Sequence, residues 1–252
     1  MQLKSIKLIL YNILAMSNES KVIKNISIII PIYNEESFLN RQITQLISDL
    51  KHIHSIHYEI LLIENGSTDN TLETAQLLAK NHNSILVLQL PDASYGLAIK
   101  EGIKRATYNT LVQFDIDLID LEFLNKALIE INQYDIVVGS KLHKNSKDNR
   151  PLPRILLSKM INFLIRTLLH YRGTDTHGIK VYRKTKVFPL IKMVKESNHF
   201  FDTEILLQAQ KAGLRIAELP INCAEMRQTR FPTTLRISQA FKEFWYLIIK
   251  YA

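Results

Sequence analysis

The feature that most constrains the fold is a repeated alternation of short β-branched runs with stretches of helical periodicity. A run at 26–30 is followed by helical apolar spacing from Phe38 to Leu50. A second run, at 58–63, leads into a helix whose cap is expected between Ser67 and Asn70. Further strands are predicted at 84–90, 110–115, 135–138 and 214–221. Strands that alternate with helices predict an α/β fold with right-handed crossovers and a mostly parallel sheet flanked by helices.

Acidic residues follow three of these strands. The turn after the first strand holds Glu35, the turn after the second holds Glu64, and the fourth strand leads into Asp115 and Asp117. Ligands of such sheets bind beyond the carboxyl ends of the strands, so all four carboxylates should lie on one edge. Side chains of a strand alternate between its two faces, so Asp115 and Asp117, at the tip of the fourth strand, are expected to point to the same side and to share a hard divalent cation. The sequence thus predicts a metal and nucleotide site, the alternative being a chance pair in a surface loop.

Basic residues are concentrated in one segment. The net charge is +8, and the stretch between Gly139 and Thr174 contains a single acid, Asp148, among many lysines and arginines. Such a balance suits nucleic acid, an anionic membrane surface or an anionic small substrate. Only Phe163 and Tyr171 could stack on bases there, so we expect no nucleic-acid partner. The single cysteine permits no internal disulfide, which fits a reducing cytosolic setting.

Three stretches have the pattern of amphipathic or interfacial helices. Residues 154–171 are apolar around most of the helical circumference. They carry Lys159 and Arg166, with Arg172 directly after them, and have no acidic partners, which favours contact with lipid headgroups over complete burial. Residues 1–16 either lie on a membrane or a partner or dock loosely, and 235–251 are also amphipathic. No apolar run reaches the roughly 18 residues of a membrane span. We therefore divide the chain into an N-terminal segment 1–22, a domain 23–232 and a C-terminal helix 233–252. We expect the protein to be peripheral on the cytoplasmic face of a membrane.

Several motifs occur in an order that resembles a known family. Pro31-Ile-Tyr-Asn-Glu-Glu, Glu64-Asn-Gly-Ser-Thr-Asp, Tyr95-Gly-Leu-Ala and Asp115-Ile-Asp are together similar to the family 2 glycosyltransferases, whose fold is the Rossmann-like GT-A fold. Motifs in the second half of the chain resemble one branch of this family. Asp175-Thr-His-Gly, Phe201-Asp-Thr-Glu-Ile-Leu and Gly213-Leu-Arg-Ile-Ala-Glu-Leu-Pro resemble the branch of dolichol-phosphate mannosyltransferases and polyprenyl-phosphate glucosyltransferases.

The resemblance implies an inverting transfer of a hexose from a GDP- or UDP-sugar to a polyprenyl phosphate, with Mg²⁺ or Mn²⁺ held by Asp115 and Asp117. Arg150 and Arg154 match arginines near the donor and acceptor phosphates, while Glu204 and Asp175 match acidic positions beside the acceptor. The implied catalytic residues are Asp117, Arg150, Arg154, Asp175 and Glu204. The implied nucleotide-sugar contacts are Pro31, Tyr33, Glu35, Glu64, Gly66, Ser67 and Asp115.

The chain departs from the family pattern at a few positions. Glu64-Asn65 stands where two aspartates are usual, and Ile119 where a glutamine is frequent, so that a metal ligand could be replaced by water or by Asp120. The late motif with Arg227 and Arg230 lacks the usual glycine. Two alternatives stay open: a saccharide hydroxyl as acceptor, with Glu204 or Asp175 as base, and a non-catalytic regulatory subunit that binds a nucleotide sugar or a partner enzyme. A membrane protein is a further possible partner.

Overall fold

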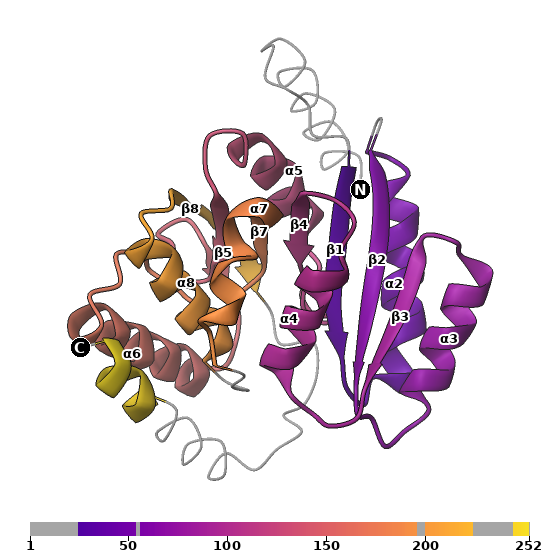
Figure 1. Cartoon of the computed structure of the whole chain (residues 1–252), viewed down its shortest axis with the longest axis horizontal. Helices are drawn as coiled ribbons and strands as arrows, with labels where there is room; N and C mark the ends of the chain where they lie inside the picture. Colours follow the sequence, from indigo (N-terminus) through magenta and orange to yellow (C-terminus); the bar gives the residue numbers. More distant parts are fainter. Residues whose placement is uncertain (1–24, 54–55, 196–199, 224–243, 252) are drawn as a thin grey trace.

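The computed structural model describes residues 25–53, 56–195, 200–223 and 244–251. A seven-stranded sheet with the order β3-β2-β1-β4-β7-β5-β8 runs through the molecule, with helices on both faces (Figure 1). Its strands are β1 (Asn25–Ile32), β2 (His57–Asn65), β3 (Ile85–Leu90), β4 (Thr110–Gln113), β5 (Ile136–Ser140), β7 (Lys180–Arg183) and β8 (Ile216–Pro220). The helices are α2 (Glu36–Leu50), α3 (Thr71–Asn81), α4 (Tyr95–Arg105), α5 (Leu121–Glu130), α6 (Leu152–Leu168), α7 (Lys184–Val187), the 3₁₀ turn η1 (Leu190–Lys192) and α8 (Phe201–Lys211). A short pair, β6 (Lys147–Asp148) and β9 (Asn222–Cys223), lies apart from the sheet.

The predicted mostly parallel sheet flanked by helices is confirmed. Strands β1, β2, β3 and β4 are parallel to their neighbours in one half of the sheet, and β5 is parallel to β8 in the other. One strand, β7, runs antiparallel between β4 and β5. The carboxyl ends of β1, β2, β4, β5 and β8 therefore share one edge with the start of β7.

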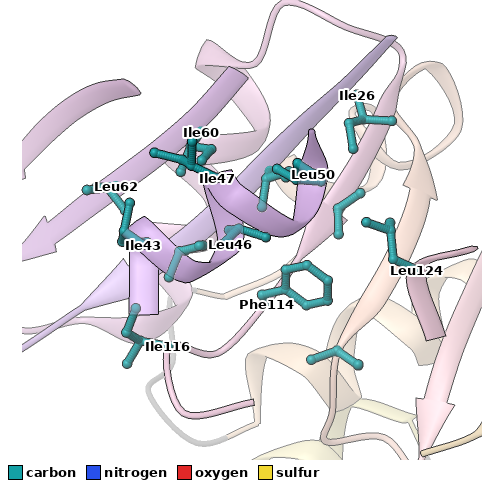
Figure 2. Packing of buried hydrophobic residues seen from close by; sticks show 14 of the residues in the cluster. Ile26, Ile43, Leu46, Ile47, Leu50, Ile60, Leu62, Phe114, Ile116 and Leu124 are labelled. Atoms are coloured by element: carbon teal, nitrogen blue, oxygen red, sulfur yellow. The ribbon is translucent and has the colours of Figure 1, made fainter. Parts of the chain in front are cut away.

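The core divides into two apolar layers because alternate residues of β1 face opposite sides of the sheet. Ile28 and Ile30 belong to a cluster with α2, α3 and α5, whereas Ile29 belongs to a cluster with α4, α6 and α8. In the first cluster the inward side of α2 packs on β2 and on Phe114 (Figure 2). In the second, Gly102 lets α4 approach so closely that a Cβ there would collide with Ile29.

Two elements leave apolar side chains at the surface. In α6 only Asn162 and Ile165 are buried. Residues 244–251 are helical and pack Leu247 inward, with Trp245 and Ile249 exposed. Among the described residues, no helix combines the length and apolarity needed to cross a bilayer. The predicted N-terminal segment, 1–22, lies outside the described residues, as does the part of the predicted C-terminal helix before 244.

Candidate active site

The turns after β1 and β2 are joined into one rigid unit. Asn34, with a φ of 53°, donates its backbone N–H to Ser67 Oγ at 3.0 Å and accepts from the backbone N–H of Thr68 at 2.8 Å. The backbone N–H of Glu35 donates to Thr71 Oγ1 at 2.7 Å. A short polar side chain such as asparagine tolerates the left-handed backbone needed for this arrangement. The two predicted nucleotide-contacting turns are therefore adjacent, and each supports the other.

Glu64 and Asn65, which replace the usual aspartates, shape the second turn. Glu64 is buried, and its Oε1 accepts the backbone N–H of Ser67 at 2.6 Å. Asn65 accepts the backbone N–H of Ser94, the residue that caps α4, at 2.8 Å. Gly66 has a φ of 73° and lies so close to the backbone of Asp92 that a side chain would be strained and crowded. The side chains of Glu64 and Asn65 thus hold the turn to its neighbours.

Pro31 and Tyr33, also predicted to contact the nucleotide, lie at the same edge. Pro31 pairs with Ile63 in the parallel register of β1 and β2. Both Pro31 and Tyr33 are half-buried, so part of each residue stays accessible.

The aspartate pair lies in a turn, not in the strand as predicted. Strand β4 ends at Gln113, and Asp115 to Leu118 form a tight turn closed by Leu118 N–H donating to the Asp115 carbonyl at 2.8 Å. Strand alternation therefore does not bring Asp115 and Asp117 together; the turn does. Burial, followed by the charges of Asp117 and Asp202, raises the pKa of Asp115 to about 6. A carboxylate whose ionisation is disfavoured by a second carboxylate beside it is a natural place for a cation.

Beneath this turn lies a buried polar cluster that the sequence pattern did not assign to the site. Asp202, on the first turn of α8, pairs with the fully buried Lys180 at 3.1 Å and accepts from Gln113 Nε2 at 3.0 Å and from the Tyr95 hydroxyl at 3.1 Å. Tyr182 donates to Gln113 Oε1 at 2.6 Å. The register of the sheet explains why Lys180 and Gln113 both contact Asp202, because Lys180 is the pairing partner of Gln113 in the β4–β7 ladder. The available sequence signal was the pair of acids two residues apart, Asp202 and Glu204, at the start of a helix.

Asp175 lies farther along the same edge, in the loop before β7. Its carboxylate is buried, accepts the backbone N–H groups of Lys141 and His177, each at 3.0 Å, and is 3.7 Å from Lys141 Nζ. Glu218 of β8 holds this loop by accepting the backbone N–H and the hydroxyl of Thr174 at 2.7 and 2.6 Å. Asp175 therefore orders the loop and places the Lys141 ammonium near the site.

The two predicted arginines differ in their surroundings. Arg150 donates from Nε and Nη2 to the carboxylate of Asp148 at 2.8 and 2.7 Å, and this pairing raises its pKa. Arg154 lies exposed on the first turn of α6. The structure thus places both near the start of α6, and its Ser158 accepts from Arg150 at 3.4 Å. Arg227 and Arg230 lie outside the described residues.

Glu204 faces away from the aspartate turn. It is 1% exposed, and it accepts from Lys250 Nζ at 2.5 Å, from the Lys195 backbone N–H at 3.0 Å and from the Tyr251 hydroxyl at 3.3 Å. These contacts attach the C-terminal helical residues 244–251 to α8. Asp202, not Glu204, is the α8 carboxylate that the structure brings next to Asp115.

The aspartate turn fits a divalent cation by the chemistry of its oxygen donors. Across the described parts of the chain, no three His, Cys, Asp or Glu side chains are grouped so that they alone could hold a metal. Asp120, a possible replacement ligand, caps α5 by accepting the Phe123 backbone N–H at 2.9 Å. Asp115 and Asp117 would thus hold a metal together with oxygens of the substrate or water, which is usual for Mg²⁺ at phosphate groups.

Comparisons with known proteins agree with this geometry. The family model described as "Glycosyl transferase family 2" matches residues 27–189. Glycosyltransferase AglD of Haloferax volcanii is 28% identical over 235 residues, which are 89% of this chain but only 38% of AglD. The human dolichyl-phosphate beta-glucosyltransferase is 27% identical over 246 residues, covering 90% of this chain and 76% of the human protein.

The fold is also similar to that of a solved enzyme. Glucosyl-3-phosphoglycerate synthase from Mycobacterium tuberculosis, in complex with Mn²⁺, uridine diphosphate and glucosyl-3-phosphoglycerate, has a TM-score of 0.64 at 17% identity, covering 90% of this chain and 79% of that one. At this identity the likeness supports the GT-A-like fold. Because the family model covers more than half of the chain and the motif-bearing strand ends lie within it, the chain belongs to glycosyl transferase family 2 and is a glycosyltransferase that uses nucleotide-sugar donors.

Proposed function

We propose that this glycosyltransferase transfers a hexose, with inversion, from GDP- or UDP-hexose to a polyprenyl phosphate at the cytoplasmic face of a membrane. The observation that carries the proposal is the carboxylate turn at the end of β4, which lies between the linked turns of β1 and β2 and the loop before β7, where Asp175 holds Lys141. Residues 23–232 would form the catalytic domain, with the terminal segments 1–22 and 233–252 at the membrane surface.

The donor would lie over the ends of β1, β2 and β4. Pro31, Tyr33, Glu35, Glu64, Gly66 and Ser67 would line the nucleoside side of that space. Asp115 and Asp117 would hold Mg²⁺ or Mn²⁺, which supplies neutralisation of the departing diphosphate. The rigid connection between the two turns, through Asn34 and Ser67, would fix the nucleotide relative to the carboxylates. Fixed positioning lowers the entropic part of the barrier.

The acceptor would enter from the side of α6 and the Asp175 loop. A phosphate oxygen is already largely ionised near neutral pH, so no strong base is required and cationic groups suffice to place it. Arg154 is the exposed candidate, and Lys141 lies beside Asp175, whereas Arg150 is largely neutralised by Asp148. The similarity to the human dolichyl-phosphate beta-glucosyltransferase and the basic, apolar helix α6 support this acceptor class.

A saccharide hydroxyl is the second candidate acceptor, and one specific observation favours it. Asp202 is a buried carboxylate that faces Asp115, and a hydroxyl acceptor needs such a group as general base. In this reading Asp202 takes the place that the sequence suggested for Glu204 or Asp175. Lys180 Nζ lies 3.1 Å from Asp202 Oδ1 and fixes the position of this carboxylate.

The test is transfer of radiolabel from a panel of GDP- and UDP-hexoses, with Mg²⁺ or Mn²⁺, into the organic phase of a mixture containing a polyprenyl phosphate. Label in the lipid that is lost with EDTA and with Asp115→Asn would support the proposal. Asp49→Asn is the matched control, because Asp49 lies near the far end of α2 from the site.

Two other outcomes would overturn the lipid acceptor, and a third would overturn the role of the carboxylate turn. Label in a saccharide but not in lipid would favour the second candidate, and Asp202→Asn should then abolish it. Metal-dependent nucleotide binding without any turnover would indicate a regulatory subunit that acts through a partner protein. Transfer that survives both Asp115→Asn and Asp117→Ala would remove the carboxylate turn from the chemistry.

A further inference from the structure

Helix α6 has two faces with different partners. Its inward face contacts the loop of the site: Asn162, which is buried, donates to Asp175 Oδ1 at 3.5 Å and accepts the backbone N–H of Thr176 at 3.3 Å. Ile165 and Leu169 continue that face into the core. The outward face packs on no described part of the chain, although it is strongly apolar.

The outward side chains of α6 form one stripe. Leu152, Leu156, Met160 and Phe163 are 73%, 64%, 54% and 64% exposed. At about 100° per residue these four lie within an arc of roughly 80°. A monomeric soluble protein seldom exposes so many large apolar side chains together, and such a stripe marks a contact surface.

The basic residues beside the stripe indicate which kind of partner it contacts. Lys159 and Arg166 are exposed and lie along one margin of the stripe, and α6 contains no acidic residue. Two copies of the chain meeting through this face would bring like charges together, which disfavours a dimer. An anionic lipid surface complements the charge, takes up the apolar side chains, and lets the basic side chains reach the headgroups.

The helical residues 244–251 expose further large apolar side chains. Trp245 and Ile249, 57% and 74% exposed, are four residues apart and so share one side of the helix. The opposite side packs Leu247 and Phe244 into the same apolar cluster as Ile165 of α6. The ion pair of Lys250 with Glu204 fixes this helix to α8. Tryptophan is suited to the headgroup level, because its ring is apolar and its N–H is polar.

We propose that the outward stripe of α6, together with Trp245 and Ile249, is the surface by which this protein docks on an anionic bilayer. The inference rests on the proposed function, because an acceptor carried on lipid requires the site to lie close to a membrane. Since the inward face of α6 contacts the Asp175 loop, docking through its outward face places the acceptor side of the site at the membrane.

The experiment measures binding of the full chain to vesicles, which requires neither donor nor turnover. Vesicles of phosphatidylcholine mixed with phosphatidylglycerol are compared with vesicles of phosphatidylcholine alone by co-sedimentation. Phe163→Glu should reduce binding to the anionic vesicles about tenfold or more. Leu77→Glu is the matched control, because Leu77 is 59% exposed on α3 and lies outside the stripe. The double variant Lys159→Glu, Arg166→Glu should remove the preference for anionic vesicles.

A second readout isolates the C-terminal helix. The chain has one tryptophan, so its fluorescence reports on Trp245 alone. We expect a blue shift on anionic vesicles and quenching by bromine-labelled lipids. Equal binding of Phe163→Glu and Leu77→Glu, or binding without any fluorescence change, would overturn the proposed surface. Loss of binding with retained transfer to a detergent-dispersed polyprenyl phosphate would support the surface and the function together. Stripe-dependent binding without transfer would leave the surface standing and count against the function.

Discussion

Replacing Asp115 with asparagine should abolish transfer but stabilise the protein in the absence of metal. Burial and the charge of Asp117 raise the pKa of Asp115 from 3.8 to about 6. The folded state therefore binds a proton more tightly than the unfolded state does, and ionising this group at neutral pH opposes folding. Asparagine keeps the size of the side chain and removes the charge.

The magnitude follows from the two pKa values. The difference between the folded and unfolded pKa values of Asp115 lowers the free energy of unfolding by about 3 kcal/mol at pH 7 and by roughly half of that at pH 5. This loss of stability develops as the pH rises from the unfolded pKa to the folded one. Asp115 as a residue is only half-buried, so we discount this figure and expect a gain of about 2 kcal/mol for Asp115→Asn at pH 7. For a chain of this size that is about 4 to 8 °C in Tm.

The assay is urea unfolding with EDTA present, at pH 7 and at pH 5, for wild type, Asp115→Asn and the control Asp49→Asn. The gain should be larger at pH 7 than at pH 5 and should be absent in the control. Added Mn²⁺ should stabilise wild type and not Asp115→Asn. If Asp115→Asn is as stable as wild type or less stable at pH 7, or if its gain does not shrink at pH 5, the electrostatic reasoning is refuted.

Further substitutions test the surroundings of the site. Asp202→Asn should destabilise the protein by about 3 kcal/mol in urea unfolding, because Lys180 is left buried without its partner; the added change Lys180→Met should recover much of that loss, and no recovery would contradict the pairing. Glu204→Gln should leave nucleotide affinity, measured by calorimetry, within about twofold of wild type, because Glu204 contacts the C-terminal helix and Lys250; an affinity loss as large as that of Asp115→Asn would return Glu204 to the site. Gly178→Ala should lower Tm by several degrees, because the new Cβ would lie 2.5 Å from a backbone oxygen of β5; an unchanged Tm would show that the loop can move.

The strands and the acidic turns were predictable because their signals are local. Runs of β-branched residues identify β1 and β2, and the ends of parallel strands must share an edge, so the order of the strands alone places Glu35, Glu64 and Asp115 together. The linkage of Asn34 with Ser67 could not be foreseen, since it depends on a left-handed backbone at a residue that is not glycine.

The orientation of α8 and the direction of β7 were not predictable. Helix α8 is buried on every side from Phe201 to Ala209, so no amphipathic pattern shows which carboxylate faces the sheet. Asp202 and Glu204 are about 200° apart on the helix and therefore have opposite surroundings. Strand β7 is four residues long, and an alternating pattern of that length is the same in either direction.

The antiparallel strand β7 also bears on the order of folding. Strands β1, β2, β3 and β4 and their connecting helices need only residues up to Gln113, so their pairings can form while the remainder of the chain is still being synthesised. Strand β7 must pair with β4 on one side and β5 on the other, across a long stretch of sequence, which is a slow step. The half of the sheet formed by β1 to β4 can thus be ordered on the ribosome well before Lys180 and Asp202 form their ion pair. The site is complete only when β7 has paired between β4 and β5.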